Sequence, residues 1–315
     1  MTSGNWVQPL SLGGKVVQGE SPASRVKIMD SPHPFRLLEP ARLTSGVVFN
    51  SPHSGRVYPA ELIRRSRLTR RGLRASEDVL VDMLFTSAPD HGAPLLAATA
   101  PRAWLDLNRA PGELDPTLIR GLRSQGLNQR VAAGLGVIPR VVSEGAEIYR
   151  GRISREEAEA RIRTIHEPYH AQLEALLLRA RDNFGMAVLL DCHSMPSEAL
   201  RAAPRVDGRS PEIVLGDRFG AAAGRALVSF VQRAFERAGF VVARNSPFAG
   251  GYITQRYGRP SRGMHAIQIE IDRALYLDQA RLEPLPCFGE VQGRLSQVVA
   301  ELAGIGSGVA SLAAE

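Results

Sequence analysis

The chain has 315 residues, 44% of them hydrophobic and 23% charged, which is ordinary for a globular protein and leaves ample apolar material for a core. The formal net charge is +7, but the arginines that supply it are scattered among acids, a pattern that favours solvated helix faces over a nucleic-acid-binding surface. Two cysteines are too few for a disulfide framework, and we find neither a signal peptide nor an apolar run of about 20 residues, so we expect a cytoplasmic protein without a membrane span.

The N-terminal third predicts an arm followed by the first elements of a sheet. Residues 1–35 are rich in Gly, Ser and Pro and show no lasting hydrophobic period, so we interpret them as a flexible arm. The apolar run 46–49 ends shortly before Pro52 and predicts a buried strand. Ser76 is placed to cap a helix that extends to about Asp90. Two further strands are predicted over residues 94–99 and 103–107.

The middle of the chain carries the strongest helical signal. Ser154 and Glu157 form a capping box, and apolar residues then keep helical spacing to about residue 183, interrupted by Pro168 and ended by Gly185. The continuous apolar run 186–190 is typical of a central strand covered on both faces. Later strands are predicted over 212–215, 240–243 and 266–271, and helices over 219–238 and 289–302. This alternation predicts one α/β domain over residues 36–315, a three-layer α/β/α sandwich with a mixed, mostly parallel sheet.

Polar side chains follow several of the predicted strands. His53 comes after the first strand, Asp106-Leu-Asn-Arg109 after another, and His193 shortly after the most apolar strand, while Glu270 lies within the last one. In open α/β sheets ligands bind at the carboxyl ends of strands, so we expect these distant residues to converge. Two histidines and a carboxylate form a catalytic zinc site that keeps an open position for water, and a glutamate beside it can act as a general base.

Seven stretches of the chain resemble the N-formylglutamate amidohydrolase (deformylase) family, over about residues 36–290. They are Asn50-Ser-Pro-His-Ser-Gly55, Asp78-Val-Leu-Val-Asp82, Asp106-Leu-Asn-Arg109, Pro168-Tyr-His170, Asp191-Cys-His-Ser194, Phe248-Ala-Gly-Gly-Tyr252 and Gln268-Ile-Glu270. That family is similar to the zinc carboxypeptidases and aspartoacylases, so the resemblance implies their fold. It also implies zinc-dependent hydrolysis of N-formyl-L-glutamate to formate and L-glutamate, a reaction of histidine breakdown.

The resemblance implies that His53 and His193 are the histidine ligands of zinc, although their chemistry also suits other divalent ions. One departure concerns the third ligand. Carboxypeptidase-like enzymes place a carboxylate three residues after the first histidine, where this chain has Arg56. We expect Asp78 to replace it, because Asp78 lies in a stretch shared with the deformylases. Two neighbouring acids remain alternatives, Glu77 and Asp82.

The same resemblance implies the catalytic and substrate-binding residues. Glu270 is expected to act as the general base, and Arg102 to polarise the scissile carbonyl group. Asn108 and Arg109 are expected to hold a substrate carboxylate. A flexible glycine loop is expected to bring further groups to the ligand, namely Tyr252, Thr254 and Arg256, with Arg256 or Arg262 binding a second carboxylate.

A second histidine pair matches a metalloprotease pattern. In His166-Glu-Pro-Tyr-His170 two histidines stand four residues apart with an adjacent glutamate. That mechanism needs an unbroken helix, and Pro168 costs about 3 kcal/mol or more in a helix interior. We therefore expect a kinked helix with Tyr169 packed inward, and His170 facing the pocket, instead of a zinc site.

Three other functions compete with the deformylase hypothesis. Different pocket residues would make the chain an amidase for another N-acyl amino acid or a small peptide. Loss of the metal would leave a binding protein of the same fold, although His53, His193, Arg109 and Glu270 are all present. The positive charge alone would allow nucleic-acid binding. We favour a small anionic N-acyl amino acid as the ligand, with neither nucleic acid nor membrane as a partner.

Overall fold

The centre of the molecule is a seven-stranded mixed sheet in the order β1-β3-β2-β4-β7-β5-β6. The computed structural model describes residues 33–123, 128–142, 145–201 and 203–306, so most of the predicted arm 1–35 lies outside the described residues. The strands are β1 (Phe35–Leu38), β2 (Val47–Ser51), β3 (Leu95–Ala98), β4 (Ala187–Met195), β5 (Ile213–Gly216), β6 (Val242–Arg244) and β7 (Met264–Asp272). Strands β3, β2, β4 and β7 are mutually parallel, whereas β1 runs antiparallel to β3, and β5 runs antiparallel to β7 but parallel to β6. The predicted mixed, mostly parallel sheet is therefore confirmed.

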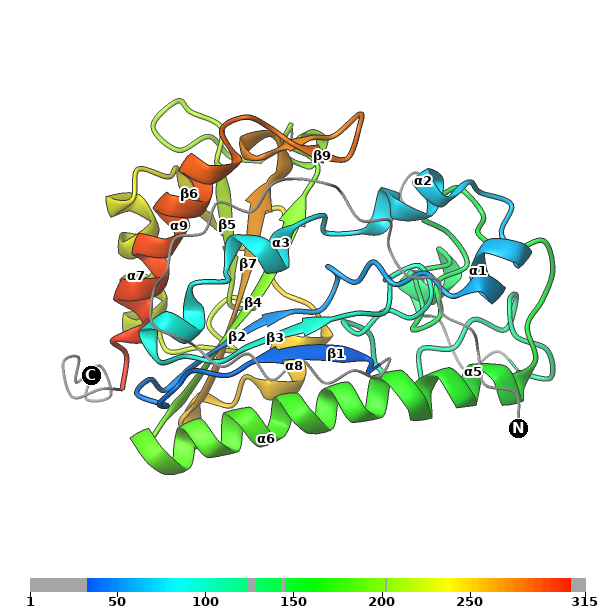
Figure 1. Cartoon of the computed structure of the whole chain (residues 1–315), viewed down its shortest axis with the longest axis horizontal. Helices are drawn as coiled ribbons and strands as arrows, with labels where there is room; N and C mark the ends of the chain where they lie inside the picture. The colour runs from blue at the N-terminus through cyan, green and yellow to red at the C-terminus, as the bar shows by residue number, and fades with distance from the viewer. Residues whose placement is uncertain (1–32, 124–127, 143–144, 202, 307–315) are drawn as a thin grey trace.

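Helices cover both faces of this sheet, as Figure 1 shows. They are α1 (Ala60–Arg65), α2 (Arg70–Leu73), α3 (Val81–Leu84), α4 (Gln129–Ala132), α5 (Arg155–Arg161), α6 (Glu167–Phe184), α7 (Arg225–Arg237), α8 (Tyr252–Tyr257) and α9 (Phe288–Ala303). Helices α7 and α9 pack on one face, where Val47 and Phe49 point, and α6 packs on the other, where Val48 points. A two-stranded sheet of β8 (Leu277–Asp278) and β9 (Glu283–Pro284) precedes α9. The three-layer sandwich is thus confirmed, and none of the helices described is long and apolar enough to cross a membrane.

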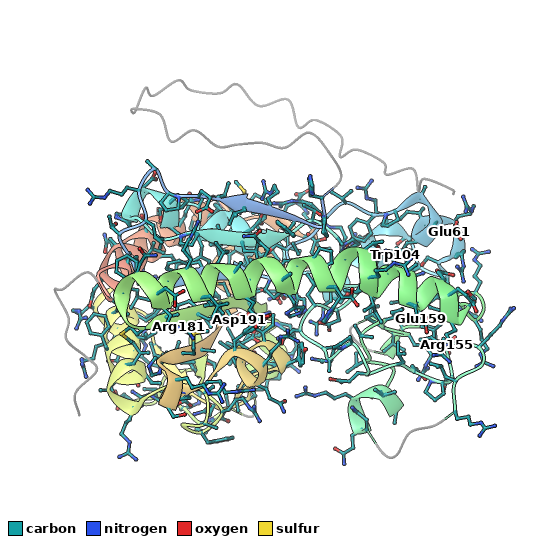
Figure 2. All side chains as sticks on the ribbon, turned by 90° about the horizontal axis from the view of Figure 1, so that it is seen from below. Glu61, Trp104, Arg155, Glu159, Arg181 and Asp191 are labelled. Carbon is teal, nitrogen blue, oxygen red and sulfur yellow. The ribbon has the colours of Figure 1, made fainter. Side chains whose placement is uncertain are left out.

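The long central helix begins and ends where the sequence predicts. The Ser154 hydroxyl accepts a hydrogen bond from the backbone N–H of Glu157, and Gly185 closes α6 with a positive φ of 75°. Between α5 and α6 the chain makes one π-helical turn, Ile162–His166, immediately before Pro168. The three segments form one continuous rod, with Arg155 and Glu159 toward one end and Arg181 toward the other (Figures 1 and 2). The wide turn, in place of the expected kink, accommodates the proline.

Two of the predicted elements are wrong, and both lie beside the functional site. The helix expected from Ser76 to Asp90 is broken, because Leu80 adopts a left-handed φ of 62° and only Val81–Leu84 is α-helical before a short 3-10 turn. Asp78 lies in extended backbone before that break, and its N–H donates to the carbonyl of His53. Residues 103–107 form turns instead of a strand. Strand β1 was not predicted, and the helix predicted from residue 219 begins only at Arg225.

A largely irregular part of the chain, residues 99–123, 128–142 and 145–154, forms a wall beside the carboxyl ends of the parallel strands. Isolated β-bridges join it to itself and to the α1–α2 region, as in the pair Ser66–Tyr149 and the pair Ile119–Ile153. Its apolar residues belong to the same core cluster as α6, which ties the wall to the sheet. The wall therefore presents its polar side chains to the sheet edge from a packed position.

Candidate active site

A cavity of about 500 Å³ opens at the carboxyl ends of β2, β4 and β7. Its lining includes most of the chemically active residues that the sequence singles out: His53, Asp78, Arg102, Asn108, Arg109, His193 and Glu270. It also includes residues that were not predicted, among them Ser76, Arg130, Ser194, Gln268 and Arg273. The expected convergence of distant segments at one sheet edge is what the structure shows.

Three buried side chains present ligand atoms to one point at the floor of this cavity. The Nδ1 atom of His193 lies 2.9 Å from Asp78 Oδ2, and the Nδ1 atom of His53 lies 3.4 Å from the same oxygen. Within the described residues these three form the one group of histidine, cysteine or acidic side chains whose ligand atoms lie close enough together, within 4.8 Å, to share an ion.

The outer nitrogens of both histidines are already engaged. His53 Nε2 donates to Asp106 Oδ1 at 2.7 Å, and His193 Nε2 donates to Asp191 Oδ2 at 3.0 Å. A neutral imidazole that donates through Nε2 presents a lone pair at Nδ1, so two lone pairs and a carboxylate oxygen face one another. Histidine ligands of metals are held by carboxylates in this way. The arrangement fits a divalent cation with a two-histidine, one-carboxylate ligand set.

The electrostatics of the site call for positive charge at the same point. His53 Nδ1 is buried and has no hydrogen-bond partner among the described residues. Burial opposes protonation of His193, yet Asp191 and Asp78 raise its pKa well above the ordinary value. Burial likewise disfavours the Asp78 carboxylate, but the neighbouring His193 and His53 hold its pKa well below the usual range. A buried cation would satisfy all three groups.

The third ligand can now be separated from its rivals. Asp78 turns Oδ2 toward the histidines, while its Oδ1 accepts a hydrogen bond from Arg273 Nη2 at 3.0 Å. Glu77 instead pairs with Arg74 and accepts from the Tyr58 hydroxyl. The third acid, Asp82, is bound at 2.5 Å by both Arg36 and Arg56. Arg56, which stands where carboxypeptidase-like enzymes have a ligand, thus holds the acid that does not face the histidines.

Glu270 lies directly across the sheet from His193. The two residues are register partners in the β4–β7 pair, so their side chains leave the sheet on the same face at neighbouring positions. Gln268 Nε2 donates to Glu270 Oε1 at 2.7 Å. Burial raises the pKa of Glu270 to about 7, and Asp78 adds to the rise. A buried carboxylate with a pKa near neutrality suits proton transfer.

Three arginines line the cavity with guanidinium groups that are not fully used. Arg102 Nε pairs with Asp106 Oδ2 at 3.0 Å and makes no other hydrogen bond among the described residues. Arg109 donates only to the carbonyls of Leu135 and Asn108, and burial lowers its pKa. The guanidinium of Arg130, on α4, forms no hydrogen bond or salt bridge with the described residues. Neither Arg109 nor Arg130 forms a salt bridge within the described residues, so both guanidinium groups can accept an anion in the cavity.

The glycine loop packs against Asn108. The side-chain oxygen of Asn108 accepts from the backbone N–H of Ile253 at 2.8 Å, and a Cβ on Gly251 would stand 2.5 Å from Asn108 Nδ2. The next residue back, Gly250, has a φ of 123°, which side chains rarely allow. These glycines let the loop and Asn108 approach closely.

Four residues expected to reach the substrate do not line the cavity: Tyr252, Thr254, Arg256 and Arg262. Thr254 is buried and donates to the carbonyl of Gly251. Arg256 donates to the hydroxyl of Tyr252 and lies 3.6 Å from Glu174. Arg262, the other arginine considered for a second carboxylate, is also absent from the lining. The geometry gives these substrate contacts no support, and they stay predictions.

The second histidine pair does not form a metal site. His166 Nε2 donates to the carbonyl of Arg109, and His170 Nε2 donates to the carbonyl of Leu107, each at 2.9 Å. Neither residue lines the cavity, although His170 was expected to face it. Tyr169 is fully buried, as expected, and its hydroxyl donates to Asn50.

Sequence reasoning missed several partners of the ligands. Asp106 and Asp191 were noted only as parts of family-like motifs. The spacing of Asp191 and His193 carried the missing signal, because residues two apart in a strand share a face. No local pattern indicates that Arg273 reaches Asp78, since the two are separated by 195 residues.

Comparisons with known proteins agree with this geometry. The family model described as N-formylglutamate amidohydrolase matches residues 45–277. A deformylase of N-formylglutamate from Pseudomonas putida is 31% identical over 237 residues, which cover 74% of this chain and 82% of that protein. Its counterpart from Pseudomonas aeruginosa is 31% identical over 242 residues with the same coverage. The crystal structure of N-formylglutamate amidohydrolase from Ralstonia eutropha JMP134 superposes with a TM-score of 0.79 at 34% identity, covering 86% of this chain and 97% of that one.

Proposed function

Because the chain belongs to the N-formylglutamate amidohydrolase family, we propose that it hydrolyses N-formyl-L-glutamate to formate and L-glutamate with the help of a divalent metal ion, zinc first among them. The observation that carries the proposal is the convergence of His53, Asp78 and His193 at the floor of a cavity lined by arginines. The names of the relatives supply the substrate, and the donor set supports the metal.

His53, Asp78 and His193 would hold a divalent ion, which would supply Lewis acidity and lower the pKa of a water molecule toward about 7. The protein residues around this site have their own tasks. Asp106 and Asp191 fix the tautomers of the two histidines, and Arg273 holds the Asp78 carboxylate in place.

Glu270 is the proton carrier in this proposal. Its carboxylate accepts a proton from the attacking water as the new C–O bond forms at the formyl carbon. It returns that proton to the amide nitrogen as the C–N bond breaks, so that the amine of glutamate leaves. Burial, which raises the pKa of Glu270 to about 7, balances its strength as a base against its strength as an acid.

Arg102 is placed to stabilise the negative charge that develops on the formyl oxygen. Its Nε is held by Asp106, and no hydrogen bond within the described residues occupies its Nη atoms. A guanidinium fixed in advance costs no reorganisation during the reaction.

Arg109 and Arg130 are our candidates for binding the two substrate carboxylates. Both line the cavity, and in the described part of the chain neither is paired with an acid. Guanidinium groups form charge-assisted hydrogen bonds with carboxylates, so a dianionic acyl amino acid complements this wall. Arg130 thus takes the role first considered for Arg256 or Arg262.

A substrate panel tests the function. Purified protein loaded with zinc is assayed with N-formyl-L-glutamate, N-formyl-L-glutamine, N-formyl-L-aspartate and N-acetyl-L-glutamate, with formate or acetate measured directly. We expect kcat/KM to be highest for N-formyl-L-glutamate and to fall for N-formyl-L-glutamine, which lacks the side-chain carboxylate. A clear preference for another acyl amino acid would replace the substrate, and failure of the protein to bind any transition metal would favour the binding-protein alternative.

A cytoplasmic location and a role in histidine breakdown belong to the same proposal. Cys192 and Cys287 are both free thiols, which suits a reducing compartment. The role in histidine breakdown rests on the proposed substrate alone.

A further inference from the structure

The segment Leu107–Arg109 carries two of the cavity residues on backbone without regular secondary structure. Its three consecutive carbonyl groups are each bound by a side chain. His170 Nε2 donates to the oxygen of Leu107, Arg109 Nη1 to that of Asn108, and His166 Nε2 to that of Arg109, at 2.8 to 2.9 Å. Buried backbone groups need partners, and here side chains replace a ladder or a helix.

The two histidines that serve this segment are neutral donors of fixed orientation. Carbonyl oxygens only accept, so each Nε2 carries the hydrogen. Burial lowers the pKa of His166 and lowers that of His170 to about 3. With His170 neutral, its Nδ1 accepts from the Tyr257 hydroxyl at 2.9 Å.

The π turn places this pair. His166 ends the π-helical turn, and His170 lies four residues later in α6, with their ring centroids 4.2 Å apart. In the turn the N–H of Glu167 bonds to the carbonyl of Ile162, five residues back, and Pro168 follows with no N–H to satisfy. The motif that resembles a metalloprotease signature is thus a pair of histidines that both donate hydrogen bonds to the segment Leu107–Arg109.

We propose that His166 and His170 are positioning residues, which lock Leu107–Arg109 so that the Arg109 guanidinium is held ready for a substrate carboxylate. This inference rests on the proposed function, because it needs an anionic substrate. Arg109 is buried, and its charge is favoured by Asp106 and Glu113 and disfavoured by Arg102 and Arg130, while none of the described acids forms a salt bridge with it. To hold the Arg109 guanidinium in one position, the backbone that carries it must be fixed. The hydrogen bonds from His166 and His170 to the carbonyls of Arg109 and Leu107 fix that backbone.

The test uses two substitutions that differ by one methylene group. His166→Gln carries an amide nitrogen at about the reach of Nε2, whereas His166→Asn ends near the position of Nδ1 and cannot reach the Arg109 carbonyl. We expect His166→Asn to raise KM for N-formyl-L-glutamate by about tenfold or more with a smaller change in kcat, and His166→Gln to stay within about threefold of the parent.

A double-mutant cycle and a matched control separate positioning from general damage. In an Arg109→Met background the two His166 variants should have the same KM, because the group that they position is gone. The same pair of substitutions at His265, a half-buried histidine about 17 Å along β7 from Glu270, should leave KM unchanged in both cases.

The outcomes distinguish the two proposals. A parent enzyme that cleaves no N-formyl amino acid would refute the proposed function, and this inference with it. An active parent whose His166→Asn and His166→Gln variants have equal KM would overturn the positioning role alone. So would a KM increase that persists undiminished in the Arg109→Met background.

Discussion

Replacing Glu270 with glutamine should slow catalysis and stabilise the metal-free protein at the same time. Glutamine has nearly the same shape and keeps an oxygen to accept the hydrogen bond from Gln268 Nε2. It cannot take a proton from water, so kcat should fall by about 10² to 10⁴, the usual contribution of general acid–base catalysis. Bound metal, measured by mass spectrometry, should stay at the parent level, because Glu270 is not a ligand.

The size of the stability gain follows from the pKa. Burial raises the pKa of Glu270 from 4.5 to about 7, so the fold prefers the protonated acid. For a raised pKa, the stabilisation is complete below the unfolded value and is lost as the pH rises through the folded value. Above pH 7 the parent therefore carries a cost on the order of 3 kcal/mol, from 1.36 kcal/mol for each pKa unit, that Glu270→Gln avoids.

Chemical unfolding of the chelator-treated proteins measures this difference at pH 8 and pH 5. We expect the variant to be more stable than the parent at pH 8, with most of the difference gone at pH 5. Glu290→Gln, an exposed position in α9, is the matched control and should change neither stability nor turnover. A Glu270→Gln protein that turns over as fast as the parent, or one that shows no stability gain at pH 8, would refute the reasoning.

Three further predictions follow from the site. His53→Ala and His193→Ala should each lose metal and activity together, measured by metal content and formate release, and retention of full metal would remove the ligand assignment. Asp191→Asn should weaken metal binding by about 10- to 100-fold in chelator competition, because both Asp191 oxygens accept hydrogen bonds and an amide offers only one acceptor. Gly251→Ala should cost about 1–3 kcal/mol in thermal unfolding as its Cβ meets Asn108, whereas Gly293→Ala on the open face of α9 should not destabilise the protein.

The sequence predicts those parts of the fold that depend on local pattern. Continuous apolar runs mark β2 and β4, and the Ser154 cap and Gly185 mark the ends of the long helix. The strand predicted over residues 103–107 is wrong because their apolar side chains pack into the wall of the site while their backbone forms turns.

The site was only partly predictable for a related reason. His53, His193 and Glu270 stand on or just after strands, so topology alone brings them together. The identity of the third ligand depends on which neighbouring acid is neutralised by an arginine. Arg36 and Arg56 occupy Asp82 over separations of 46 and 26 residues, and no local period encodes such pairs.

The order of strands in the sheet also sets a sequence of events for the nascent chain. The proposed metal ligands stand at positions 53, 78 and 193, and His53 and His193 come together only when β2 pairs with β4 across some 140 residues of intervening chain. Closing so long a loop is slow compared with forming a helix such as α6. We therefore expect tight ion binding only after β2 and β4 have paired. The absorption of cobalt bound at the three-residue site would then report the time at which the centre of the sheet forms.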